Sequence, residues 1–169
     1  MADLRRRSPL EHRTDDLAWV ADLSHGSVAV AEVLFLTQMD VRTCDPAALG
    51  LPVQPNTWTR AGDGSDALWL GPDEWLLVGP ATRAAVPGVV DVSANRAVLD
   101  LTGSGVREFL SKGCALDLHT DHWTDGDCAQ TMLAKAPVIL QQRGAVTRVF
   151  VRPSFADYLA EWLLAAARG

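Results

Sequence analysis

Cysteine is scarce in this 169-residue chain, which contains only Cys44, Cys114 and Cys128. Small secreted proteins that rely on disulfides carry an even and denser set of cysteines. The first 16 residues are charged and lack the apolar segment of a secretory signal. We therefore predict a protein without a disulfide framework that works in the reducing cytoplasm.

Long apolar runs and lysine are scarce as well. No segment approaches the roughly 18 consecutive apolar residues that cross a bilayer, so the sequence predicts no membrane partner. The net charge of −6 excludes general affinity for nucleic acid. Among the 15 cationic residues only Lys112 and Lys135 are lysines. The others are arginines, whose planar and weakly hydrated guanidinium suits protein interfaces.

Hydrophobic residues, by contrast, make up 48% of the chain and include six tryptophans. Tryptophan serves both as a core residue and as an interface anchor, so both roles stay open. The length predicts a single compact domain over residues 15–169, with two small lobes of about 15–88 and 89–169 as an alternative. Residues 1–14 are polar, rich in arginine and without a period, and they predict an N-terminal arm.

Apolar or alternating runs bounded by turn residues predict most of the regular structure. The clearest is a hairpin whose turn is residues 71–74 (GPDE), with proline where a type I turn fixes φ. Further strands are predicted within residues 28–42, 89–103, 129–143 and 146–152.

The same reading predicts a short helix after Asp45, a second within residues 103–113 and a third over residues 154–168. Asp45 is expected to cap the first helix, and Ser104 or Thr102 the second. Ser154 and Asp157 form a start that resembles a capping box for the third. Strands with a few helices predict an α+β fold with a mainly antiparallel sheet.

The stretch 111–130 (SKGCALDLHTDHWTDGDCAQ) collects side chains that could bind zinc, namely Cys114, Asp117, His119, His122 and Cys128. Its spacing contains neither C-x-x-C nor H-E-x-x-H, and a tetrahedral site needs such close pairs. The residues around the two histidines also avoid helices. We predict a solvated loop whose aspartates make turns and caps, with no metal site.

Two of the cysteines lie in this stretch, but neither has the setting of a nucleophile. Cys114 follows the end of a predicted helix, where the dipole disfavours a thiolate. Cys128 begins an apolar strand. Both are predicted to be buried, unreactive thiols.

The tripeptide 103–105 (GSG) joins a strand to a helix, which is the context of a phosphate cradle. A dinucleotide fingerprint would place a third glycine at position 108, where Glu108 stands instead. A carboxylate there would repel a pyrophosphate. We predict a structural tight turn.

Several segments give the chain a strong resemblance to the gamma subunits of heterotetrameric sarcosine oxidase. They occur in family order and cover nearly the whole chain: RSPLEHR (7–13), LGLPVQPNT (49–57), LWLGPDEWLLV (68–78), the run from Val90 to His119, AQTMLAKAPVILQ (129–141) and VRPSFADYLAEWLL (151–164). The chain departs from the family pattern at residues 123–126 and at 82–88, where a longer helix is expected.

The resemblance implies a protein without chemistry of its own. Such complexes oxidatively demethylate sarcosine in the bacterial cytoplasm to glycine and hydrogen peroxide, and pass a one-carbon unit to tetrahydrofolate. Flavins, NAD and the sarcosine site belong to the alpha and beta subunits, and zinc to the delta subunit. The resemblance therefore implies no catalytic, cofactor-binding or metal-binding residue here. The implied fold looks like the folate-binding module of the glycine cleavage T-protein, an aminomethyltransferase.

Three hypotheses follow. The first is a non-catalytic gamma subunit that assembles with alpha, beta and delta subunits and has no activity alone. The second is a free-standing folate-binding module of one-carbon metabolism, and the third a small metal- or thiol-dependent enzyme built on residues 111–130. For the first hypothesis, the arginine-rich arm supplies the expected interface residues: Arg5, Arg6, Arg7, Leu10 and Arg13.

Overall fold

The structure is a computed structural model that describes residues 6–79 and 88–169. Its strands form two five-stranded sheets in which all strand pairs are antiparallel. Sheet 1 contains, in spatial order, β1 (Ala29–Glu32), β7 (Ala97–Thr102), β10 (Val146–Val151), β9 (Ala136–Arg143) and β8 (Cys128–Leu133). Sheet 2 contains β3 (Trp58–Arg60), β4 (Asp66–Gly71), β5 (Glu74–Val78), β2 (Gln38–Arg42) and β6 (Val89–Asp91).

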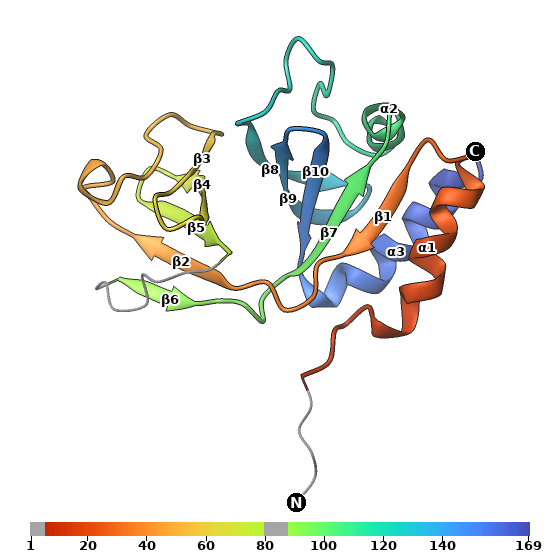
Figure 1. Cartoon of the computed structure of the whole chain (residues 1–169), viewed down its shortest axis with the longest axis horizontal. Coiled ribbons are helices and arrows are strands. Elements are labelled where there is room, and N and C mark those ends of the chain that lie inside the picture. The colour runs from red at the N-terminus through yellow and green to blue at the C-terminus, as the bar shows by residue number, and fades with distance from the viewer. Residues whose placement is uncertain (1–5, 80–87) are drawn as a thin grey trace, which may run out of the picture.

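Helices cover one face of sheet 1. The helices α1 (Thr14–Leu23) and α3 (Pro153–Ala167) pack side by side there (Figure 1). The remaining helical elements are short: α2 (Val106–Ser111) and the 3-10 turns η1 (Glu11–Arg13) and η2 (Ala47–Leu49). The prediction of an α+β fold with mainly antiparallel sheet is confirmed.

Three apolar layers hold these elements together. The largest lies between sheet 1 and the helices. The second lies between the two sheets, where Leu68 and Leu76 of sheet 2 meet Ile139 and Phe150 of sheet 1. The third covers the outer face of sheet 2, where the buried Trp75 donates a hydrogen bond from Nε1 to the carbonyl of Pro52 at 2.8 Å. The two sheets therefore share a core, because alternate residues of their facing strands point at one another.

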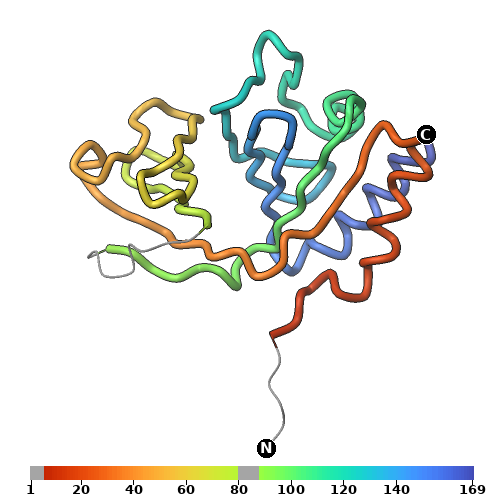
Figure 2. The backbone as a smooth tube through the Cα atoms, viewed as in Figure 1, coloured from red at the N-terminus to blue at the C-terminus, as the bar shows by residue number. Residues whose placement is uncertain are grey.

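The boundary between the sheets differs from the predicted lobes of residues 15–88 and 89–169. Both α1 and β1 pack in sheet 1, whereas β6 belongs to sheet 2. The chain therefore crosses between the sheets twice, at residues 33–37 and 92–96, and the two crossings run side by side (Figure 2). Backbone hydrogen bonds join each crossing to the strand beside the other one, from Val33 N to Val98 O of β7 at 2.8 Å and from Val92 N to Gln38 O of β2 at 2.9 Å. Which strands pair in this way is decided by tertiary contacts, and the sequence pattern does not show it.

The helix caps were predicted with mixed success. Asp45 accepts a hydrogen bond from the backbone of η2 at 3.1 Å, as expected. The other two predicted caps are wrong: α2 begins after Gly105 and α3 after Arg152, in both cases without a side-chain cap. Asp157 is instead engaged by residues of the N-terminal segment. The longer helix expected at residues 82–88 lies outside the described residues, apart from Gly88.

Candidate functional site

The polar stretch 111–130 forms the end of α2, a loop and the start of β8. Its aspartates bind the local backbone. Asp117 Oδ1 accepts a hydrogen bond from His119 N at 3.0 Å, and Asp127 Oδ2 accepts one from Thr124 N at 2.6 Å. In the part of the chain that the structure describes, no three His, Cys, Asp or Glu side chains converge as metal ligands. The predicted turn roles of Asp117 and Asp127 are confirmed.

The two cysteines of this stretch are buried in different layers of the core. Cys114 lies between sheet 1 and the helices, and Cys128 lies between the sheets. The Cys128 thiol donates to the Thr57 carbonyl at 3.2 Å. Burial raises its pKa to about 12, so the nucleophilic thiolate is disfavoured at neutral pH. The prediction of buried thiols is confirmed.

The space beside the turn at residues 103–105 is occupied by the backbone of residues 27–28. Gly105 N donates a hydrogen bond to Ser27 O at 3.0 Å. A Cβ atom added at Gly103 would lie 2.2 Å from the same oxygen. The turn therefore packs directly against the connection between α1 and β1, and its role as a structural tight turn is confirmed.

The N-terminal segment is more ordered than an arm. Leu10 is 0% exposed and belongs to the core beneath α1 and α3, so its assignment as an interface residue is wrong. Ser8 holds the segment before Leu10 in place. Its Oγ donates a hydrogen bond to the Glu32 carboxylate and accepts one from Leu10 N at 3.0 Å. Arg7 remains exposed, with Glu11 at 3.9 Å. Arg5 lies outside the described residues.

Arg13 ties the start of α1 to α3. Its guanidinium donates to three carboxylates: Asp157 at 2.6 Å, Glu161 at 2.9 Å and Asp16 at 3.0 Å. His12 Nε2 also lies 2.8 Å from Asp157. The hydrogen bond from Arg13, followed by that from His12, lowers the pKa of Asp157 to about 2. Arg13 is thus engaged within the chain, and its role as an interface residue stays a prediction.

The Asp157→Asn variant is expected to be less stable than the wild type, with a pH dependence that identifies the cause. A depressed carboxyl pKa stabilises the fold above the unfolded value of about 4 and loses this effect as the pH falls through the folded value. The difference in melting temperature between the two proteins should be constant above pH ~5, decrease as the pH falls, and vanish near pH ~1. Asp73→Asn, on the exposed β4–β5 turn, is the control. A difference that persists at the acid end would contradict this account.

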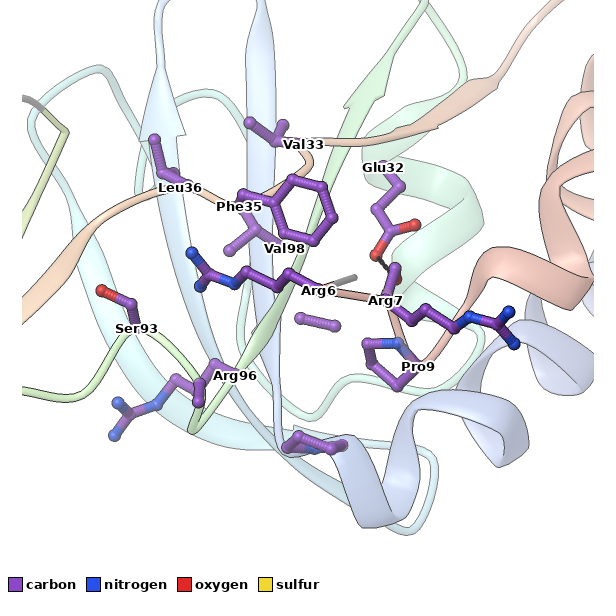
Figure 3. Close-up of a pocket in the computed structure, with 14 residues that line it drawn as sticks. Arg6, Arg7, Pro9, Glu32, Val33, Phe35, Leu36, Ser93, Arg96 and Val98 are labelled. Atoms are coloured by element: carbon purple, nitrogen blue, oxygen red, sulfur yellow. Dashed lines mark hydrogen bonds between the residues drawn. The ribbon is translucent and has the colours of Figure 1, made fainter. Parts of the chain in front are cut away.

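A small pocket lies where the N-terminal segment passes the two crossings between the sheets (Figure 3). Its volume is about 160 Å³. Val33, Leu36 and Val98 form apolar walls, and the side chains of Arg6 and Arg96 extend along its open side (Figure 3). The pocket therefore combines an apolar floor with cationic groups.

The crossing at residues 33–37 contributes an exposed aromatic ring to the rim of this pocket. Phe35 is 46% exposed, and its neighbour Leu34 is 57% exposed. The Arg6 guanidinium lies over the Phe35 ring, 5.0 Å from its centroid. Of the predicted interface residues, only Arg6 and Arg7 reach this pocket within the described part of the chain.

Comparison with known proteins decides the family. Residues 41–168 match the family described as sarcosine oxidase, gamma subunit family. The chain belongs to this family. Its relatives include the sarcosine oxidase gamma subunits of an Arthrobacter species, at 34% identity, and of Corynebacterium sp. strain P-1, at 33% identity. Both alignments cover 95% of this chain and 89% of the relative.

Solved structures agree with this gamma-subunit assignment. A chain of the heterotetrameric sarcosine oxidase from Corynebacterium sp. U-96, in complex with pyrrole 2-carboxylate, superposes with a TM-score of 0.84 at 32% identity. The match covers 96% of this chain and 94% of that one. Aminomethyltransferase T of the glycine cleavage system from Bartonella henselae shares the fold, with a TM-score of 0.65 at 14% identity, over 95% of this chain and 60% of that one. The predicted family and the predicted likeness to an aminomethyltransferase fold are both confirmed.

Sequence reasoning about this gamma-subunit family member missed the importance of Phe35 and Arg96. A signal was present, because Leu34 and Phe35 are apolar residues in a stretch where the strand alternation breaks. Of the two roles left open for tryptophan, exposure on the surface fits one of the six, Trp19, which is 53% exposed. Trp75 and Trp123 are buried.

No helix within residues 6–79 and 88–169 has the length and apolarity to span a membrane.

Proposed function

We propose that this chain is the non-catalytic gamma subunit of a heterotetrameric sarcosine oxidase. The observation that supports the proposal best is the superposition on a chain of such an enzyme over 96% of this chain at 32% identity. In this proposal the chain assembles with alpha, beta and delta subunits in the cytoplasm. Its contribution is structural, because it adds a folded surface to the complex rather than reacting groups.

The chemistry belongs to the partners in this proposal. The complex oxidises sarcosine to glycine with release of hydrogen peroxide, and passes the one-carbon unit to tetrahydrofolate. Flavins, NAD and the sarcosine site lie on the alpha and beta chains, and zinc on the delta chain. The polar groups of residues 111–130 support this division, since Asp117 and Asp127 are engaged in local turns and Asp125 accepts a hydrogen bond from Gly144 N.

Co-expression tests the proposal. With the alpha, beta and delta chains present, the protein should elute with them as one stable complex in gel filtration, with equal stoichiometry of the four chains. The isolated chain should be colourless and have no sarcosine oxidase activity. A chain that elutes separately, under conditions in which the other three assemble, would refute the assembly role.

Titration of the isolated chain with tetrahydrofolate separates this role from a free-standing folate-binding module. The likeness to an aminomethyltransferase concerns the fold alone, and folds carry many unrelated functions. We therefore expect no saturable binding below about 1 mM, which corresponds to a binding free energy of about 4 kcal/mol. Binding in that range would favour the folate-binding alternative.

A further inference from the structure

The turn Leu34–Phe35 has an unusual backbone for its residue type. Phe35 has φ 54°, in the left-handed region that bulky residues rarely adopt. A residue held in this way is normally compensated by burial or hydrogen bonding of its side chain. Phe35 is instead 46% exposed, and Leu34 beside it is 57% exposed. The chain thus holds two apolar side chains out in solvent on a backbone that is itself unfavourable.

The pocket beside this turn has the size of a side chain rather than of a cofactor. Its volume of about 160 Å³ is well below the roughly 300–1,000 Å³ of most small-molecule sites. Val33, Leu36 and Val98 give it apolar walls. One or two apolar side chains of a docking protein would fill it, in the way that interface anchors fill pockets on their partners.

The charge around the pocket is positive, although the whole chain is acidic. Arg6 lies on the Phe35 ring, and the half-buried Arg96 lines both this pocket and an adjacent hollow of about 140 Å³ that Arg152 also lines. Burial and the neighbouring Arg152 lower the pKa of Arg96, and a carboxylate brought to this place would offset the repulsion from Arg152.

The carboxylates nearest to these arginines are already engaged by other groups. Glu32 accepts a hydrogen bond from Ser8, and Asp91 accepts one from Ser93 N at 2.8 Å. Asp40 and Glu74 act on Arg96 as weaker attractions than the repulsion from Arg152. Arg6 already attracts Asp91 and helps to lower the pKa of that carboxyl. Arg96 is repelled by Arg152 more strongly than either Asp40 or Glu74 attracts it, so Arg96 is the cation that an additional anion would stabilise most.

We infer that Leu34, Phe35 and the pocket lined by Arg6 and Arg96 form the docking site for an acidic segment of a partner subunit. The segment presents a carboxylate to the arginines and an apolar side chain to the pocket. This inference rests on the proposed assembly role and identifies the surface through which the chain would contact its partner. A second copy of this chain is disfavoured as the occupant, because two chains of charge −6 repel each other.

Matched variants of the full chain test the site against the purified complex of the alpha, beta and delta chains. Phe35→Ser is compared with Trp19→Ser, since these rings are 46% and 53% exposed. Arg96→Glu is compared with Arg168→Glu, an exposed arginine near the C-terminus. We expect the site variants to raise the dissociation constant about 30-fold, as hot-spot residues do, and the controls to change it less than about three-fold.

Two further variants and one stability measurement separate loss of docking from loss of folding. Arg6→Glu, in the exposed N-terminal segment, repeats the charge test without disturbing the half-buried Arg96. Thermal unfolding of each isolated variant shows whether it is folded. Phe35→Gly should keep the wild-type melting temperature or raise it, because glycine accepts the left-handed backbone, and it should still weaken assembly.

The outcomes separate the two proposals. If the wild type fails to join the other subunits, the assembly role itself is wrong. If the wild type joins and the folded variants Phe35→Ser and Arg6→Glu join equally well, the docking site is wrong while the assembly role stands. A change in self-association of the isolated chain, without a change in assembly, would identify a second copy as the occupant and would also overturn the inference.

Discussion

Replacement of Asp66 by alanine is expected to lower the free energy of unfolding by about 3 kcal/mol, the lower end of the range for breaking a buried ion pair. Asp66 is 2% exposed and lies in β4, on the face that meets sheet 1. Its Oδ2 accepts hydrogen bonds from Arg143 at 2.7 Å and from Gln141 at 2.9 Å, both from β9. Arg60 of the neighbouring strand β3 lies 3.0 Å from Oδ1. One carboxylate thus joins the two sheets.

The cost comes from the groups that the alanine variant leaves behind. Gln141 is 0% exposed, so its amide would lose its partner in a place that water does not reach. The side chain of Arg143 is 24% exposed, which lets water partly replace the carboxylate and keeps the cost at the lower end of the range. Because a domain of this size is stable by only about 5–15 kcal/mol, the loss would be large.

Urea denaturation of the isolated chain measures this effect. Asp66→Asn, which keeps the shape and one acceptor oxygen, should lose about half as much as the alanine variant. Asp73→Ala is the control, because the side chain of Asp73 is 69% exposed and its distance to Arg42 is 3.9 Å. Equal stabilities of the Asp66 and Asp73 variants would show that the bridge between the sheets contributes nothing.

Gly103→Ala is expected to lower the free energy of unfolding by about 3 kcal/mol or more, from overpacking and backbone strain together. The new Cβ would lie 2.2 Å from Ser27 O and 3.2 Å from the Cα of Val28, so backbone would have to move. Gly103 also has φ 122°, which L-residues rarely adopt. The shift would disturb the hydrogen bond between Gly105 and Ser27 that joins the start of α2 to the connection between α1 and β1.

Gly126→Ala separates the two causes. Gly126 has φ 100°, but an added Cβ there would meet no atom within 4 Å. This control therefore carries the backbone strain without the clash, and should cost about 1 kcal/mol. Thermal or urea unfolding of both variants gives the comparison. If the two alanine variants were equally stable, the close approach at Gly103 would contribute nothing to the free energy of unfolding.

Much of the fold follows from local sequence. The hairpin of β4 and β5 was predicted because proline and glycine mark its turn between two apolar runs. Helix α3 was predicted because its apolar residues recur at helical spacing, and Leu159 and Leu163 are indeed buried. Cys114 and Cys128 were correctly predicted to be buried, the first because it follows a helix end and the second because it begins an apolar strand. Each of these features depends on residues within a few positions of one another.

The candidate site was predicted only in part, because its members come together from distant segments. Arg6, Phe35 and Arg96 lie around one pocket although long stretches of chain separate them. Leu10 was mistaken for a surface residue because its neighbours in the sequence are charged, whereas its partners in space are the apolar residues of α1 and α3. The partner of Arg13 inside the chain was missed for the same reason, since Asp157 lies 144 residues away.

The sequence alone determined which segments form most of the helices and strands, the absence of a disulfide framework and the membership in the gamma-subunit family. These features depend on local periodicity, on residue counts and on the order of motifs, all of which can be read from the sequence without the structure. The tertiary structure decided which strands share a sheet, which charges are already paired and which apolar residues remain exposed. The bridge from Asp66 to Arg143 spans 77 residues, and no local pattern records such a contact, because its energy depends on burial that exists only in the folded chain.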